Sequence, residues 1–154
     1  MQDYHCIFYT MAAETSARIG DGLMTSGGDP KAIGIFKASG GEGKPCYTEI
    51  SVCWAKGEAE AKRIAYEQWP IAANEGELNR DLATPAHYEQ LARMVDAEDV
   101  AKKLVIGPDP KKYIDKLNKV IDAGYDHISI HQLRDILIIK QLQGLLSREV
   151  SSSG

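Results

Sequence analysis

The chain has 154 residues, of which 44% are hydrophobic and 26% are charged, which is ordinary for a soluble globular protein. This length allows one domain with a real core, but it is short for a closed eight-stranded α/β barrel, which takes about 250 residues. The formal net charge of -4, with 18 Lys and Arg residues scattered among 22 acids, excludes the concentrated basic surface that nucleic acid binding needs.

The first part of the chain predicts alternating strands and helices. Residues Tyr4–Tyr9 are rich in aromatic and apolar side chains and predict a buried strand, and a short helix is expected over Met11–Arg18. A brief strand follows at Leu23–Thr25. Asp29 can then cap a helix that has Pro30 at its first position.

The middle of the chain contains the clearest strand pattern, at Glu49–Trp54. Its alternation puts three side chains on one face, namely Ile50, Val52 and Trp54. A helix is expected over residues 56–69, and residues 70–84 form an excursion of a length that is usually functional or disordered. Thr84 is expected to cap a helix that has Pro85 at its start, and another short helix is expected over Asp96–Lys103.

The last part predicts one capped helix, one strand and one apolar helix. Asp109 is expected to cap a helix that Gly124 ends in the left-handed conformation. A strand follows at Ile128–His131, and a very apolar helix is expected within residues 135–148 before a disordered tail at 151–154. The repeated strand-then-helix order predicts an α/β fold with parallel strands and outer helices, in a single domain over residues 1–150.

Membrane insertion and disulfide bonding are both unsupported by the sequence. No apolar run approaches membrane-spanning length, and the N-terminus lacks a basic segment followed by an apolar stretch. Cys6, Cys46 and Cys53 are odd in number and lack metal-ligand spacing, which indicates reduced thiols in a cytoplasmic protein. Cys53 is most simply a small core residue.

Five motifs carry a resemblance to a known family: "RIGDGLMTSG", "EQWP", "TPAHYEQLARMV", "EDVAKKLVIGPDP" and "VIDAGYDHISIHQ". Together they resemble the C-terminal half of luciferase-like oxidoreductases over about residues 4–132, most nearly the branch that uses the deazaflavin coenzyme F420. The resemblance implies a (βα)4 half of a TIM-type (β/α)8 barrel, with strands five to eight. Such enzymes hold flavin or deazaflavin at the C-terminal strand ends. Their acid–base residues lie in the N-terminal half, so the catalytic residues here are unknown.

The sequence departs from the family pattern at three places. Relatives follow the first of these strands with a small-residue loop, whereas this chain has Cys6 to Thr10, whose bulk would block a coenzyme phosphate. The loop expected after "HISIHQ" is replaced by Leu133 to Asp135, which lead directly into a helix pattern. Gly28 stands where the sugar-phosphate branch has a lysine, which weakens the case for a sugar phosphate.

Cofactor-binding candidates lie at the predicted strand ends. Thr25, Ser26 and Gly27 follow a strand and by resemblance could hold a phosphate or ribityl group, with a plain loop as the alternative. Trp54 could line a ring pocket, although a core position is the more common role of such a residue. His131 and Gln132 are candidates for lining the pocket.

Two lysines are candidates for substrate binding. Lys102 and Lys103 stand where relatives present a basic residue to an anionic substrate, and a solvated helix end is the alternative, because cations favour helix C-termini. No metal site is expected, because His127 and His131 are too far apart on an extended strand to chelate a metal without further ligands.

Two functions remain open from the sequence. The first is a truncated luciferase-like oxidoreductase that transfers hydride or performs monooxygenation with F420 or FMN, or that binds neither by itself. The second is a non-catalytic half-barrel assembly or binding module that has lost the cofactor site.

The predicted strand count also suggests partners. Four parallel strands cannot close a barrel, and the inward side chains of Ile50, Val52, Trp54 or their neighbours would meet water in a monomer. A homodimer is therefore expected, or a complementary N-terminal half-barrel chain. The apolar stripe of the final helix, at positions 138, 142 and 145, is expected to pack against a second protein surface.

Overall fold

The computed structural model describes residues 4–74 and 82–133, with side chains from Thr10 onward. These residues form two compact units, and each is described by itself. Unit 1 consists of residues 4–50 and 116–131, and unit 2 consists of residues 51–74, 82–115 and 132–133. No helix in the described part of the chain is long and apolar enough to span a bilayer.

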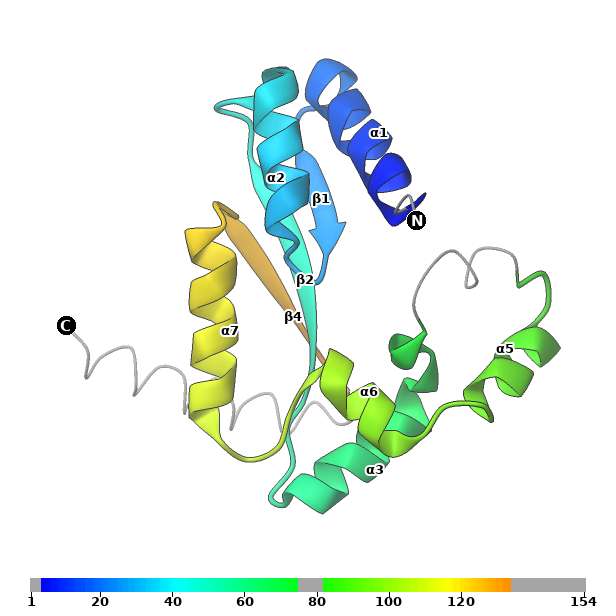
Figure 1. Ribbon diagram of the computed structural model, residues 1–154. Helices are drawn as coiled ribbons and strands as arrows, with labels where there is room; N and C mark the ends of the chain where they lie inside the picture. Colours follow the sequence, from blue (N-terminus) through cyan, green and yellow to red (C-terminus); the bar gives the residue numbers. More distant parts are fainter. Residues whose placement is uncertain (1–3, 75–81, 134–154) are drawn as a thin grey trace. The chain divides into compact units, whose positions relative to one another are not determined.

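Unit 1 is built on parallel strands with helices packed against them (Figure 1). Its elements are α1 (Tyr4–Ile19), β1 (Leu23–Ser26), α2 (Pro30–Phe36), the π-helix η1 (Lys37–Gly41), the first five residues of β2 (Cys46–Cys53), the C-terminal part of α7 (Pro110–Asp122) and β4 (His127–Gln132) up to His131. The parallel strands with surrounding helices confirm the predicted fold class, a partial α/β barrel.

Strand β2 lies between β1 and β4. Leu23 N–H donates to the carbonyl of Pro45 at 2.9 Å, and Asp126 N–H donates to the carbonyl of Cys46 at 2.9 Å. Because successive carbonyls of a strand point to opposite edges, the two neighbours occupy opposite edges of β2. The Asp126 carboxylate also accepts from Cys46 N–H at 2.7 Å, so Asp126 and Cys46 hold each other through two hydrogen bonds.

The N-terminal segment corrects one prediction. Tyr4–Tyr9 do not form a strand; they begin helix α1, which continues without a break to Ile19 beside α2. Strand propensity spans only about 1 kcal/mol per residue and yields to packing. Ala13 and Ala17, four residues apart on one helical face, are 2% exposed and anchor α1 in the core. The remaining core side chains of unit 1 include Leu23, Ile33, Phe36, Cys46, Val120 and Tyr125.

The two faces of β2 differ in burial, and the more exposed face carries the neighbours of Ile50 and Val52 along the strand. Ile50 and Val52 are only 3% and 2% exposed, so these two side chains do not meet solvent. In unit 1 the face that carries Tyr47 and Glu49 is the open one, with Tyr47 41% exposed. A buried apolar residue on β2 therefore marks the side that the helices cover.

Unit 2 is mostly helical. Its elements are α3 (Glu58–Gln68), the 3-10 helix η2 (Pro70–Ala73), α5 (Pro85–Ala92), α6 (Ala97–Lys103), β3 (Val105–Ile106), the start of α7 and the ends of β2 and β4. The two-residue strand β3, which the sequence did not predict, pairs in parallel with Val52 and Cys53. Cys53 is fully buried in the core of this unit, as predicted, beside Ala61, Ile64, Val100 and Ile106.

Of the predicted helix caps, Asp29 and Asp109 are confirmed by their hydrogen bonds, whereas the side chain of Thr84 precedes α5 without a capping hydrogen bond. Asp29 and Asp109 each accept from the backbone N–H two residues later at 2.9 Å, and Asp96 accepts from Asp99 N–H at 2.9 Å. Gly124 ends α7 with a φ of 99°. The predicted apolar helix within 135–148 and the tail at 151–154 lie outside the described residues.

Candidate functional site

The predicted site residues fall in both units, so the structure assembles them into two separate groups. Unit 1 contains Thr25, Ser26, Gly27 and His131, and unit 2 contains Trp54, Gln132, Lys102 and Lys103. In parallel α/β folds, ligands bind at the C-terminal ends of the strands. The geometry of each group at those ends decides what it can bind.

Thr25 belongs to a chain of hydrogen bonds that fixes the end of β1. Its hydroxyl lies 2.8 Å from the hydroxyl of Tyr125 and 3.1 Å from that of Thr48. Tyr125 in turn donates to the carbonyl of Asp29 at 3.0 Å, and Thr48 donates to the carbonyl of Thr25 at 3.3 Å. Thr48 is 2% exposed and Tyr125 is 4% exposed, so this network is internal. Thr25 therefore positions the loop, and its hydroxyl is already engaged.

The backbone of the loop after β1 is engaged as well. Gly27 N–H donates to the carbonyl of Glu49 at 2.7 Å, and Gly28 N–H donates to the hydroxyl of Thr48 at 3.1 Å. Both glycines have positive φ angles, 78° and 71°, which bring these N–H groups toward β2. A phosphate could not use the same two donors without breaking these bonds. The loop therefore does not offer a backbone cradle for a phosphate.

Side chains supply the remaining polar groups at this strand end. The Lys116 ammonium, from α7, donates to the carbonyl of Gly27 at 2.8 Å. Burial lowers the pKa of Lys116, and the nearby Lys119 lowers it further. Among the described residues no carboxylate forms an ion pair with Lys116. Together with the exposed Ser26 hydroxyl, Lys116 could meet an anionic group.

The open face of unit 1 carries two side-chain pairs. The rings of Tyr47 and His127 stack with centroids 4.5 Å apart and an interplanar angle of 14°. His131 Nδ1 lies 4.0 Å from Glu49 Oε1, with both side chains partly exposed. This pair places an imidazole beside a carboxylate near the C-terminal end of β4. The described residues contain no cluster of three or more potential metal ligands, so the structure gives no support for a metal site.

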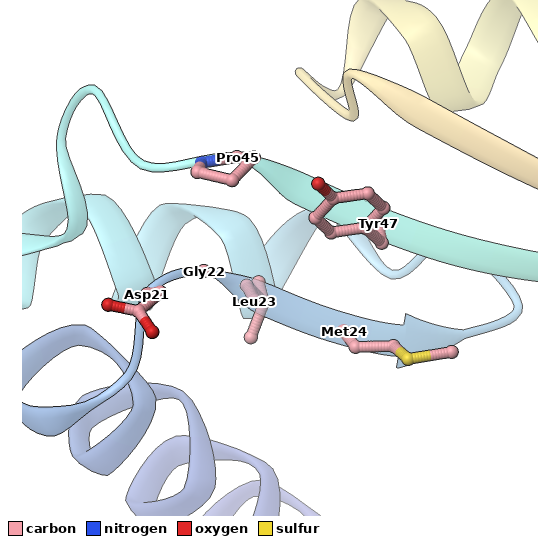
Figure 2. Close-up of a pocket in the computed structure, with 6 residues that line it drawn as sticks. All are labelled: Asp21, Gly22, Leu23, Met24, Pro45 and Tyr47. Atoms are coloured by element: carbon pink, nitrogen blue, oxygen red, sulfur yellow. The ribbon is translucent and has the colours of Figure 1, made fainter.

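An open hollow of about 260 Å³ lies at the other end of the same face (Figure 2). It is lined by Asp21, Gly22, Leu23, Met24, Pro45 and Tyr47, at the N-terminal ends of β1 and β2. Figure 2 shows Met24 and Tyr47 on the two neighbouring strands. Because barrel ligands sit at the opposite strand ends, this hollow is not a candidate for the coenzyme.

In unit 2, Gln132 joins the ends of β2 and β4. Its side-chain oxygen accepts from Trp54 N–H at 3.2 Å, and its side-chain nitrogen donates to the carbonyls of Leu133 and Trp54 at 2.8 and 3.4 Å. Gln132 is 8% exposed and is engaged with backbone. Trp54 packs beside Val52 and Tyr113, and its buried Nε1 has no hydrogen-bond partner in the described structure. A cofactor role for Trp54 or Gln132 stays a prediction.

Lys102 and Lys103 occupy the last turn of α6 and are exposed. The Lys102 ammonium lies 2.9 Å from the Asp99 carboxylate, and this hydrogen bond raises the pKa of Lys102 and lowers that of Asp99. A cation at a helix C-terminus is also favoured by the helix dipole. These contacts agree with a solvated helix end and leave substrate binding as a prediction.

The sequence analysis missed three residues that shape the unit 1 site. Thr48 and Tyr125 lie 23 and 100 residues from Thr25, and Lys116 lies 89 residues from Gly27. Lys116 had no distinguishing signal, because exposed lysines are common on helices. Tyr125 had a weak one, because a tyrosine directly after a helix-ending glycine is placed to pack against the same core.

No protein-family model matches the chain. Two known proteins are similar in sequence. The chain is 27% identical over 120 residues to the F420-dependent glucose-6-phosphate dehydrogenase of Rhodococcus erythropolis (strain PR4 / NBRC 100887), and the match covers 62% of this chain and 36% of that protein. It is 23% identical over 145 residues to the same kind of enzyme from Kribbella flavida (strain DSM 17836 / JCM 10339 / NBRC 14399), covering 79% and 40%. The chain thus spans 36% to 40% of the length of these relatives.

Solved structures show the same fold. One is an F420-dependent secondary alcohol dehydrogenase in complex with an F420-acetone adduct, with a TM-score of 0.61 and 14% identity, covering 80% of this chain and 40% of the other. Another is the coenzyme F420-dependent tetrahydromethanopterin reductase from Methanopyrus kandleri, with a TM-score of 0.50 and 15% identity, covering 80% and 42%. Sequence and fold together support the resemblance to luciferase-like, F420-dependent oxidoreductases over part of their length.

Proposed function

We propose that the chain, as a relative of luciferase-like F420-dependent oxidoreductases, forms part of a site that exchanges hydride between coenzyme F420 and an organic substrate. The observation that carries this proposal is that all four relatives are named as F420-dependent, while the matched fold places chemistry at the C-terminal strand ends. FMN is the less supported coenzyme, because none of these relatives is named for it.

The residues of unit 1 fit the coenzyme through side chains. The deazaflavin supplies the hydride-accepting or hydride-donating ring when it is bound. Ser26 and Lys116 would bind its anionic chain, since the backbone donors of Gly27 and Gly28 are engaged by Glu49 and Thr48. When a hydroxyl-bearing carbon loses hydride, its hydroxyl loses a proton, and His131 beside Glu49 could receive it at Nε2.

The alternative function is a non-catalytic assembly or binding module. The engaged hydroxyl of Thr25 and the engaged N–H groups of Gly27 and Gly28 favour it, because these groups hold the loop together without a ligand. In that case the barrel scaffold would be retained for its surface, and the strand ends would bind no coenzyme.

A titration separates the two functions. The full chain is titrated with F420 and with FMN while coenzyme fluorescence and absorbance are followed. We expect F420 to bind with a Kd below about 1 mM, equivalent to roughly -4 kcal/mol, and more tightly than FMN. Lys116→Gln should weaken F420 binding several-fold. Lys31→Gln serves as the control, because Lys31 is an exposed lysine on α2 whose ammonium donates no hydrogen bond to another described residue.

The outcome decides directly between the proposals. If neither coenzyme binds up to about 1 mM, the oxidoreductase proposal is abandoned in favour of the assembly module. If F420 binds equally well to the Lys116→Gln variant, coenzyme binding stands but its assignment to the end of β1 is wrong.

A further inference from the structure

Helix α1 carries apolar side chains on two opposite faces. One face packs into the core of unit 1, beside α2, through Ala13 and Ala17 (Figure 1). The other face is open to solvent, yet it carries Met11 at 61% exposure and Ile19 at 83%. A surface helix normally presents polar and charged side chains to water, and a helix that is apolar all round is usually buried. The outer face of α1 therefore has the composition of a contact surface.

The centre of this outer face is formed by small side chains. Thr15 lies midway between Met11 and Ile19, with the exposed Ala12 close to it. Helix geometry places Met11 and Ile19 about 40° to either side of Thr15 and about 6 Å before and after it along the axis. Short side chains at the centre let a second helix approach closely, because the distance between packed helices depends on the side chains at the contact. The two larger side chains then lie on the flanks.

Two charged residues lie on one flank of the same face. Around the helix Arg18 lies about 60° from Thr15, and Glu14 lies about 100° from it in the same direction. The two are spaced four residues apart, as an ion pair within a helix requires. Even so, neither forms an ion pair with any described residue. Both charges are therefore available to a partner.

These positions are self-complementary about Thr15. When two copies of α1 pack antiparallel around a two-fold axis at Thr15, each residue meets the residue of the second copy that is equally far from position 15 on the other side. Met11 then meets Ile19 of the second copy. On the flank, Arg18 lies about 3 Å along the axis from Glu14 of the second copy, so opposite charges are brought together twice. A second copy therefore matches this face in both shape and charge.

We propose that the outer face of α1, formed by Met11, Ala12, Thr15, Arg18 and Ile19, docks a second copy of this chain, antiparallel and with Thr15 on the two-fold axis. One pair of helices buries less than the roughly 800 Å² per partner of a stable interface, so the dimer is a transient one. The strand ends take no part in this contact, which makes it independent of coenzyme binding.

Sedimentation equilibrium of the full chain from about 10 µM to about 1 mM tests the association. We expect the mass to rise with concentration from 16.9 kDa towards double that value. Ile19→Asp places a charge against Met11 of the second copy and should weaken the association about tenfold or more. Ile121→Asp makes the same change on α7, at a site 56% exposed, and should leave the association unchanged. Circular dichroism verifies that both variants are folded.

Charge reversal tests the register of the two helices. Arg18→Glu alone and Glu14→Arg alone each bring like charges together across the axis, and each should weaken the association several-fold. The double variant with both changes restores opposite charges in every copy, so it should regain the association of the unchanged chain. Contact through another surface of the chain does not predict this rescue.

Three results would overturn the proposal. The first is a chain that stays folded and monomeric up to about 1 mM. The second is a dimer that Ile19→Asp leaves intact, which would assign the association to another surface. The third is a dimer that both single charge reversals weaken but that the double variant does not restore, which would exclude the antiparallel pairing about Thr15.

Discussion

Replacing Tyr125 with phenylalanine removes one hydroxyl from the centre of the unit 1 network and leaves the ring in place. The hydroxyl makes two hydrogen bonds, one donated to the carbonyl of Asp29 at 3.0 Å and one accepted from Thr25 at 2.8 Å. The side chain is 4% exposed, so water cannot readily replace it.

The size of the effect follows from what each partner retains. Thr25 keeps a second acceptor, the hydroxyl of Thr48 at 3.1 Å, so its loss is partial. The carbonyl of Asp29 loses this donor altogether. A net hydrogen bond contributes about 1 kcal/mol, and a buried group left unsatisfied costs about 1–3 kcal/mol. Tyr125→Phe should therefore lower the free energy of unfolding by about 1.5 kcal/mol, or the Tm by about 3–6 °C for a chain of this length.

Urea unfolding followed by far-ultraviolet circular dichroism measures this loss, and the m-value should stay unchanged. Hydrogen exchange of Gly28 N–H, which donates to Thr48, reports the same network locally and should accelerate about tenfold. Tyr47→Phe makes the same chemical change at a position 41% exposed and should cost less than about 0.5 kcal/mol.

The reasoning would be refuted if Tyr125→Phe and Tyr47→Phe cost the same. A second check is a double-mutant cycle, in which Thr25→Val and Tyr125→Phe are measured separately and together. Because the two hydroxyls contact each other, their effects should be non-additive by about 1 kcal/mol. Additive effects would mean that the 2.8 Å contact contributes nothing to stability.

Three further predictions test other parts of the chain. Gly28→Ala should lower the free energy of unfolding by about 2–4 kcal/mol, because its φ is +71° and the added methyl group would lie 2.6 Å from the Val120 side chain. Gly27→Ala, at φ +78° with open space around it, should lower it by about 1 kcal/mol, and thermal unfolding compares the two variants. Burial raises the pKa of Tyr113 above its ordinary value, so above about pH 10 the hydroxyl ionises more readily in the unfolded chain than in the folded one. Its contribution to the free energy of unfolding is therefore complete below about pH 10 and falls by about 1.4 kcal/mol for each further pH unit. Urea midpoints at increasing pH should fall less steeply for Tyr113→Phe, and parallel curves would contradict this. Changing Ile138 and Leu142 together to Asp should cause dissociation or precipitation, and a soluble, folded variant of unchanged mass in light scattering would count against an apolar contact there.

Local signals in the sequence predicted the helix boundaries well. Asp29 and Asp109 cap their helices and Gly124 ends α7, because each signal acts through bonds to residues within a few positions. The alternation in Glu49–Trp54 likewise predicted a strand, although β2 begins earlier, at Cys46.

Features that depend on distant residues were not predictable in this way. Tyr4–Tyr9 have strand propensity, but the packing of Ala13 and Ala17 carries the whole segment into helix. The alternation in β2 also did not show which of its two faces the helices would cover, so the sequence left open whether Ile50 or its neighbours would meet water. The contacts of Thr25 with Tyr125 join residues 100 apart, which periodicity cannot connect.

The reciprocal hydrogen bonds between Cys46 and Asp126 determine when unit 1 can finish folding during protein synthesis. In the sequence, unit 1 consists of a segment before unit 2 and a segment within its later part. Strand β2 therefore cannot form its hydrogen bonds with Asp126, at the start of β4, until Asp126 has been synthesised. From Ile50 to Asp126 the ribosome adds 76 residues (126 minus 50), which takes about 4–15 s at about 5–20 residues per second. During that interval Val120 and Tyr125 do not yet pack with Leu23 and Phe36 in the core of unit 1. The apolar surface of the nascent N-terminal segment is therefore incompletely covered and accessible to chaperones.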